Sequence, residues 1–141
     1  MQENGLKGTF NINSGLFAKE SGGRRMTEEE CIELYSSPNA EVAVHGTMHR
    51  SLSKVSPANA IEDIISDRKN LERIFKKRIQ GMAYANGDWN DEVAQMMKMC
   101  GIKYARTVTS TENFDLPKDW LKLHATCHHA NPKLMELAEK F

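Results

Sequence analysis

The sequence predicts a single α/β domain built of mainly parallel strands wrapped by helices. Short apolar segments alternate with helical patterns in the order β-α-β-α-β-α-β-β-α, which is typical of a parallel sheet. The chain has 141 residues and is 40% hydrophobic, enough for one core. It contains no internal repeat, low-complexity segment or linker, so we expect one domain over residues 1–141.

The first part of the chain predicts two strands separated by a helix. Residues 8–13 read as a short strand. Thr27 followed three residues later by Glu30 is typical of a capped helix start, and this helix stops before residues 36–39. Residues 41–44 (EVAV) contain two β-branched valines and predict the next strand.

The clearest helix begins with Ser56 as cap and Pro57 at the first helical position. Apolar residues then recur at helical spacing and give one apolar face: Ala60, Ile61, Ile64, Ile65, Leu71, Ile74 and Phe75. The basic run 76–78 suits the negative end of the helix dipole. The remaining predicted elements are a strand at 79–84, a turn at 86–88, a helix at 92–99 capped by Asp91 and ended by Gly101, a strand at 102–108, a weaker strand at 121–125 and a helix at 131–141.

Composition and charge exclude some classes of partner. Nineteen basic residues balance nineteen acidic ones, so we expect no binding of nucleic acid through bulk charge. No apolar run is long enough to span a membrane, and we expect no membrane partner. Residues 1–5 contain no apolar signal core, which predicts a cytoplasmic protein.

The three cysteines are widely spaced and form no CxxC pair, so we expect free thiols. Cys100 follows a methionine-rich stretch and reads as a core residue. Cys127 lies beside His128, which leaves thiolate chemistry or metal binding open at that position.

The most informative segment is His45-Gly46-Thr47-Met48-His49, directly after the predicted strand 41–44. Two imidazoles four residues apart can reach one metal ion, and strand ends are where α/β proteins place their active sites. The pattern is not the HExxH helix of metalloproteases, because Gly46 occupies the place of the glutamate. A catalytic zinc needs three protein ligands, so the pair is incomplete by itself.

Several motifs, in order along the chain, resemble the polysaccharide deacetylase family, also called carbohydrate esterase family four or the NodB-homology domain. Residues 7–10 (KGTF) resemble its "TFF" strand, and residues 45–49 resemble its H-[S/T]-x-x-H metal motif. Residues 81–88 (GMAYANGD) resemble its third motif, elsewhere R-x-P-Y-G or A-Y-P-Y-G. Residues 101–107 (GIKYART) resemble the "GI-YART" strand of one branch, and residues 114–120 and 126–129 are similar to the tail of that branch.

This resemblance implies a distorted β/α barrel that removes acetyl groups from N-acetylated sugars with a divalent metal, most simply zinc. It assigns His45 and His49 as metal ligands and the backbone amide of Asn86 as an oxyanion-hole donor. Tyr84, Trp89 and His128 become candidate substrate-binding residues, with an acetylated oligo- or polysaccharide as partner. In the family the metal is held by two histidines and one aspartate. A second aspartate acts as general base, and a histidine of the last strand acts as general acid.

The chain departs from the family pattern at both ends. The first motif, a strand ending in "TFDD", has no counterpart before Thr9, and the last strand has none after the predicted terminal helix. In the third motif Ala83, Ala85 and Asn86 replace the usual Arg, Pro and Tyr. We therefore expect an incomplete barrel whose open sheet edges favour self-association.

Three explanations remain open: a fragment of a longer enzyme, an inactive relative, and a chain completed by a separate polypeptide. A non-catalytic carbohydrate-binding or regulatory remnant is the alternative function. A further hypothesis is a structural metal site that combines the histidine pair with Cys127, His128 and His129. Asp88 is a candidate for a substitute third ligand.

Overall fold

A computed structural model describes residues 5–141 and contains one five-stranded sheet in which all strands are parallel. The strand order is β1-β2-β3-β4-β5, so each strand pairs with its neighbours in the sequence. The strands are β1 (Gly8–Ile12), β2 (Ala40–Val44), β3 (Gly81–Ala83), β4 (Tyr104–Ser110) and β5 (Leu123–Ala125).

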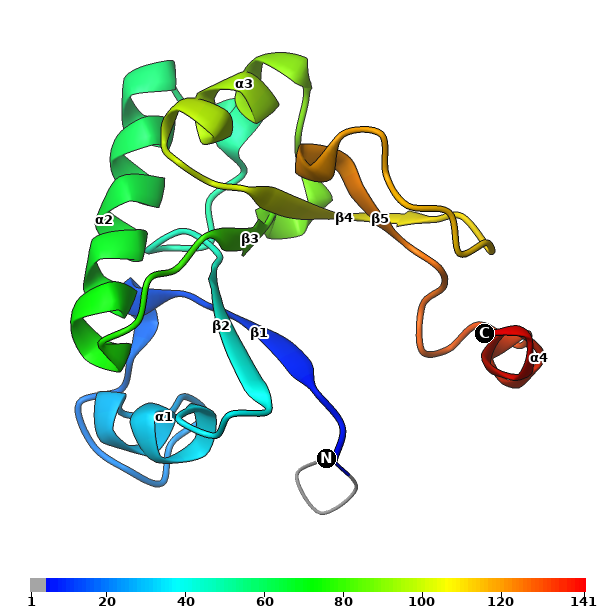
Figure 1. Cartoon of the computed structure of the whole chain (residues 1–141). Coiled ribbons are helices and arrows are strands. Elements are labelled where there is room, and N and C mark those ends of the chain that lie inside the picture. Colours follow the sequence, from blue (N-terminus) through cyan, green and yellow to red (C-terminus); the bar gives the residue numbers. More distant parts are fainter. Residues whose placement is uncertain (1–4) are drawn as a thin grey trace.

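The helices are α1 (Glu28–Tyr35), α2 (Pro57–Phe75), α3 (Asp91–Met99) and α4 (Leu134–Lys140). Four short 3-10 helices lie in the loops of the described residues. Three of them follow strands β1, β2 and β3: η2 (Ser14–Leu16), η3 (Leu52–Lys54) and η4 (Ala85–Gly87). The fourth, η5 (Trp120–Lys122), precedes β5. Helices α1, α2 and α3 lie on one side of the sheet, whereas α4 stands apart on the other side (Figure 1).

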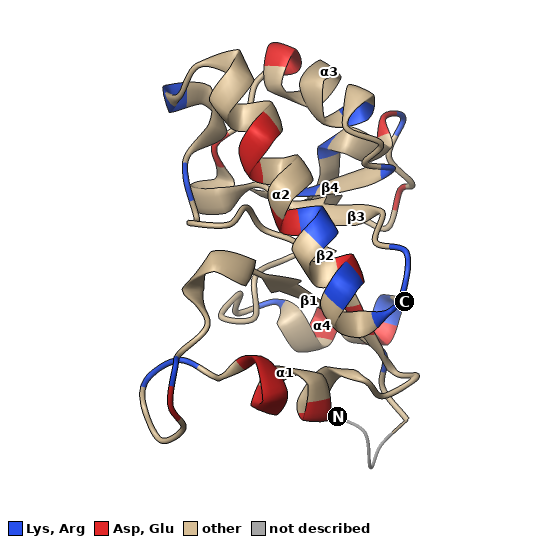
Figure 2. Cartoon of the chain, turned by 90° about the vertical axis from the view of Figure 1, so that its left-hand side faces the viewer, with Lys and Arg blue, Asp and Glu red and all other residues tan. Residues whose placement is uncertain are grey.

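The core lies between the sheet and helices α2 and α3. Val44, Met82 and Ala105 occupy one row across β2, β3 and β4, and all three are buried. Ile64 and Leu71 of α2 belong to the same cluster, which explains why the apolar face of this helix repeats at helical spacing. Acidic and basic residues both occur along α2 (Figure 2); Glu62, Lys69 and Arg73 are exposed, whereas Asp63 and Asp67 are buried.

The fold class predicted from the sequence is confirmed: the sheet is parallel, helices cover it, and it does not close into a barrel. Strands β1 and β5 form its two edges within the described part of the chain. The expectation that such edges favour self-association stays a prediction.

Element boundaries differ from the predicted ones where local capping decides them. Helix α2 ends at Phe75 because Lys76 has left-handed backbone (φ 53°), so the basic run 76–78 lies outside it. Asn90, and not Asp91, caps α3, since its side chain accepts the backbone N–H of Val93 at 2.8 Å. The terminal helix begins at Leu134 instead of residue 131.

A close approach between β3 and β4 requires glycine at position 81. A Cβ atom at Gly81 would lie 2.1 Å from the ring of Tyr104, its cross-strand partner. No helix among residues 5–141 is long and apolar enough to cross a membrane.

Candidate functional site

His45 follows the last residue of β2, and a hydrogen bond fixes the orientation of its ring. Its Nδ1 atom lies 2.8 Å from the carbonyl oxygen of Ala83, at the end of the neighbouring strand β3. Because a carbonyl only accepts, Nδ1 carries the proton and Nε2 keeps its lone pair. Burial lowers the pKa of His45, which favours the neutral imidazole that a metal ion binds.

His49 lies against His45, so the structure brings the two predicted ligands together. Their ring centroids are 4.7 Å apart and the rings meet at 74°. Both residues are partly exposed, as a site open to a ligand requires. The loop reaches this shape through two left-handed residues, Gly46 (φ 78°) and His49 (φ 56°).

Two buried carboxylates of α2 accept hydrogen bonds from the backbone of residues 45–49, the histidine loop. Asp67 accepts the N–H of His45 at 3.0 Å and the N–H of Ser14 at 2.7 Å. Asp63 accepts the N–H of Thr47 at 3.2 Å and also the Thr47 hydroxyl. Burial raises the pKa of Asp67, and hydrogen bonding from the side chain and backbone of Ser14 and from the backbone of His45 opposes that shift.

The sequence analysis did not single out Asp63 and Asp67. A signal was available, because two aspartates four residues apart interrupt the apolar face of a helix that carries Ala60, Ile64 and Leu71. A buried carboxylate at such a position needs hydrogen-bond donors, which here are the backbone amides of the neighbouring loops.

The loop after β1 holds the histidine loop from the opposite direction. The Asn13 side chain donates to the carbonyl oxygens of His45 at 2.8 Å and Gly46 at 2.7 Å. The N–H of Gly15 donates to the carbonyl of Thr47 at 3.0 Å. Both N–H and carbonyl groups of the histidine loop therefore form hydrogen bonds, with α2 on one side and with the loop after β1 on the other.

The loop after β3 carries Asn86, the candidate oxyanion-hole residue. Asn86 is exposed and left-handed (φ 58°), and its side chain donates to the Ser51 hydroxyl at 3.0 Å. Asp88 accepts both the N–H and the hydroxyl of Ser53. Both of its oxygens thus serve the contact between the two loops, and the structure gives Asp88 no place beside the histidines as a third ligand.

Tyr84 is a core residue in this structure, contrary to the expectation that it contacts substrate. Only 2% of it is exposed, and its hydroxyl donates to the carbonyl of Leu121 at 2.9 Å. Trp89 is half-buried against it, with ring centroids 6.1 Å apart. The Lys122 ammonium lies 5.5 Å from the Trp89 ring centroid and makes a cation–π contact with it.

His128 is exposed on the loop between β5 and α4. Its recorded contacts are local: the N–H of Ala130 donates to its Nδ1 at 3.1 Å, and the ring of His129 lies 4.0 Å away. Residues 5–141 contain no group of three or more His, Cys, Asp or Glu side chains that could hold a metal ion. The hypothesis of a structural site joining the histidine pair to Cys127, His128 and His129 is therefore wrong.

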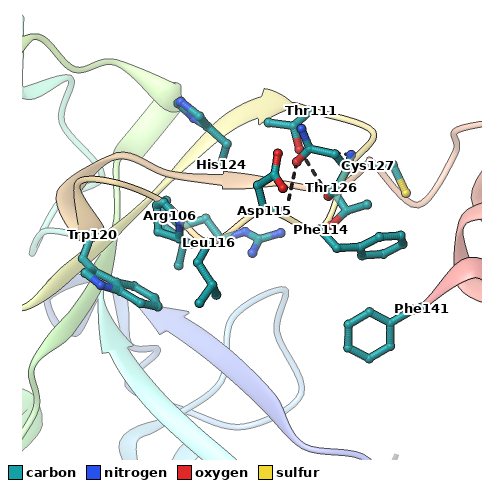
Figure 3. A pocket seen from close by; sticks show the side chains of 13 residues that line it. Arg106, Thr111, Phe114, Asp115, Leu116, Trp120, His124, Thr126, Cys127 and Phe141 are labelled. Atoms are coloured by element: carbon teal, nitrogen blue, oxygen red, sulfur yellow. Dashed lines mark hydrogen bonds between the residues drawn. The ribbon is translucent and has the colours of Figure 1, made fainter.

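A cavity of about 490 Å³ lies elsewhere, between β4, β5 and the C-terminal segment. Arg106, Trp120 and His124 line it together with Phe114 and Phe141 (Figure 3). Neither His45 nor His49 is among its lining residues, so this cavity and the histidine pair are separate features.

The donor set fits a divalent metal in part. The two imidazoles are adjacent, and Nδ1 of His45 is hydrogen-bonded to the Ala83 carbonyl, as is usual for the non-ligating nitrogen of metal-binding histidines. The described residues bring no third protein ligand to the pair. The described residues therefore bring together two candidate ligands, fewer than the three protein ligands of a catalytic zinc site.

A parallel α/β sheet with a histidine pair after one of its strands is the arrangement of β/α proteins, which place their functional sites at the carboxyl ends of the strands. The family profile described as polysaccharide deacetylase matches residues 1–105. The chain belongs to the polysaccharide deacetylase family, as its motifs predict.

Solved structures of this family share the fold. IcaB from Ammonifex degensii superposes with a TM-score of 0.77 at 16% identity, over 98% of this chain and 64% of that one. The deacetylase PplD of Streptococcus pyogenes, solved in complex with acetate, gives a TM-score of 0.71 at 19% identity, over 84% and 51%. BA3943 of Bacillus anthracis, a pseudoenzyme of carbohydrate esterase family four, gives a TM-score of 0.60 at 15% identity, over 74% of this chain and 34% of that one.

The chain thus spans between about a third and two thirds of the length of these structures. A comparison with curated protein sequences gives no significant match.

Proposed function

We propose that the chain acts in the hydrolytic removal of acetyl groups from N-acetylated sugars, with His45 and His49 as two ligands of a divalent cation, most simply zinc. The observation that carries this proposal is the His45–Ala83 hydrogen bond, which leaves Nε2 unprotonated beside His49. Family membership and the deacetylase fold support it.

The chain's own residues have separate roles in this proposal. His45 and His49 present imidazole nitrogens to the cation, and the lowered pKa of His45 favours its neutral, metal-binding form. The exposed turn at Asn86 offers its backbone N–H to the oxygen of the acetyl group, which becomes negatively charged during hydrolysis. A bound cation supplies Lewis-acid polarisation of the carbonyl and a water of lowered pKa.

Trp89 and His128 stay proposed sugar contacts with different support. Trp89 is partly exposed beside the Asn86 turn, where an indole can stack on a sugar ring. His128 is exposed but its recorded contacts do not tie it to the histidine pair. Acetylated oligo- or polysaccharides are the proposed partners.

A second candidate function is binding of such sugars without turnover. Two observations favour it: the described residues bring only two metal-binding side chains together, and a pseudoenzyme of the family shares the fold. The two functions differ in whether acetate is released.

The test is acetate release from acetylated chito-oligosaccharides in the presence of added Zn²⁺, compared between the wild type and His45→Ala/His49→Ala. Release by the wild type that the double variant loses supports the deacetylase. Calorimetric binding of the sugar without release by either protein supports the second candidate. Neither binding nor release contradicts both functions for this chain.

A further inference from the structure

Asp67 connects three parts of the molecule that are distant in sequence. From α2, its Oδ1 accepts the N–H of Ser14, in the loop after β1, and its Oδ2 accepts the N–H of His45, in the loop after β2. The side chain is completely buried, and the ion pairs of the described residues do not include it. A buried carboxylate without a cation costs free energy, and the hydrogen bonds that it accepts from Ser14 and His45 offset this cost.

Asp63, one turn earlier on the same helix, uses its carboxylate differently. One oxygen, Oδ1, accepts both hydrogen bonds from Thr47. The other oxygen, Oδ2, is buried without a hydrogen-bond partner and lies under Gly46, where a Cβ atom would come within 2.6 Å of it. Asp67 therefore needs two acceptor oxygens, whereas Asp63 needs one.

We propose that Asp67 is a positioning residue that fixes the His45 backbone against the loop after β1, so that the His45 ring donates Nδ1–H to Ala83 and presents Nε2 outward. The geometry is a chain of two hydrogen bonds: Asp67 holds the main chain of His45, and the Ala83 carbonyl holds its ring at 2.8 Å. Without the Asp67 hydrogen bond the His45 backbone can shift, and the hydrogen bond to Ala83 alone then has to hold the ring in one rotamer. Only the consequence for metal binding rests on the proposed function; the ring orientation does not.

The difference between the two aspartates gives a matched pair of isosteric variants. In Asp67→Asn, one acceptor oxygen is replaced by an NH₂ group that faces a backbone N–H donor, so one of the two bonds is lost. In Asp63→Asn, the remaining oxygen accepts both bonds from Thr47 and the NH₂ group takes the place of the unpartnered oxygen. Glu62→Gln, at an exposed position of α2, controls for the change in charge.

Nuclear magnetic resonance of the metal-free protein reads the proposed effect directly. We expect ring ¹⁵N shifts of a single Nδ1–H tautomer at His45 in the wild type, Asp63→Asn and Glu62→Gln. In Asp67→Asn we expect a mixture of tautomers and amide exchange of His45 and Ser14 accelerated about tenfold, with α3 amides unchanged. Calorimetric titration with Zn²⁺ should give about tenfold weaker binding for Asp67→Asn, the usual cost of losing an outer hydrogen-bond partner of a ligand.

An unchanged His45 tautomer and unchanged amide exchange in a folded Asp67→Asn would overturn the proposal. A wild-type protein that binds no Zn²⁺ would contradict the metal role of His45, and the tautomer would still decide the role of Asp67. If circular dichroism shows that Asp67→Asn is unfolded, Ser14→Pro replaces it, because it removes one donor from Asp67 at a helical first position that tolerates proline. A smaller tautomer shift in the same direction supports the proposal, and a wild-type spectrum overturns it.

Discussion

Asp88 accepts two hydrogen bonds from Ser53, one from the backbone N–H at 2.9 Å and one from the hydroxyl at 2.8 Å. This contact joins the loop after β3 to the loop after β2. A second contact, from the Asn86 side chain to Ser51, joins the same loops. Side-chain hydrogen bonds therefore connect the turn at Asn86 to the segment that follows His49 in the chain.

Replacing Asp88 by alanine should destabilise the protein by about 1 kcal/mol, because both hydrogen bonds from Ser53 are lost. The free energy of unfolding in urea, followed by circular dichroism, measures this effect. Asp115→Ala is the matched control, since Asp115 is exposed on the loop between β4 and β5. Equal destabilisation by the two substitutions would show that the Asp88–Ser53 contact contributes no stability.

The contribution of Asp88 should depend on pH in the acid range. Hydrogen bonding from the Ser53 hydroxyl holds the pKa of Asp88 below its usual value. A carboxyl group with a lowered folded-state pKa stabilises the fold above its unfolded-state pKa, about 3.9, and this stabilisation is lost as the pH falls through the folded-state value. The stability difference between wild type and Asp88→Ala should thus be constant above about pH 5 and shrink at lower pH. A difference that grows on acidification would contradict this sign.

Tyr84→Phe should lower stability by about 1 kcal/mol and leave sugar binding unchanged. The Tyr84 hydroxyl is buried and donates to the Leu121 carbonyl, so its removal leaves an unpaired acceptor in the core. Tyr35→Phe is a control on a less buried ring. Thermal unfolding and calorimetric titration with an acetylated chito-oligosaccharide measure the two effects. Weakened sugar binding with unchanged stability would restore Tyr84 as a substrate contact.

The three thiols should react with iodoacetamide in a defined order. Cys31 and Cys100 are buried, and burial raises the pKa of both thiols, that of Cys31 to about 11. Cys127 is partly exposed. Because the thiolate is the reactive form, Cys127 should be alkylated first at pH 8 in the folded protein, as peptide mass mapping can show. Labelling of all three at equal rates would mean that the core opens readily under these conditions.

The sequence predicts the fold class and the histidine pair because both depend on local patterns. The apolar periodicity of α2 and the short strands could be recognised in the sequence. His45 directly follows β2, which predicted its position at the end of the sheet. Helix ends were harder to predict. Helix α2 ends where Lys76 adopts a left-handed backbone, and α3 begins at the side-chain cap of Asn90. Neighbouring residues could equally have taken these two roles.

Contacts between distant loops could not be predicted from local patterns. Asp67 meets Ser14 and His45 only after α2 packs on the sheet, and Asp88 meets Ser53 only when the β2 and β3 loops are adjacent. Tyr84 illustrates the converse, because its motif position indicated substrate binding but the packing of Leu121 buries it.

The most direct test of the proposed site is the zinc content of the chain after equilibrium dialysis against Zn²⁺, measured by mass spectrometry. The proteins to compare are the wild type, His45→Ala/His49→Ala and the control His128→Ala/His129→Ala. The proposal predicts about one ion per chain in the wild type and the control, and none in the His45/His49 variant. No ion in the wild type, or an ion that survives in the His45/His49 variant, would contradict the assignment of this pair as metal ligands.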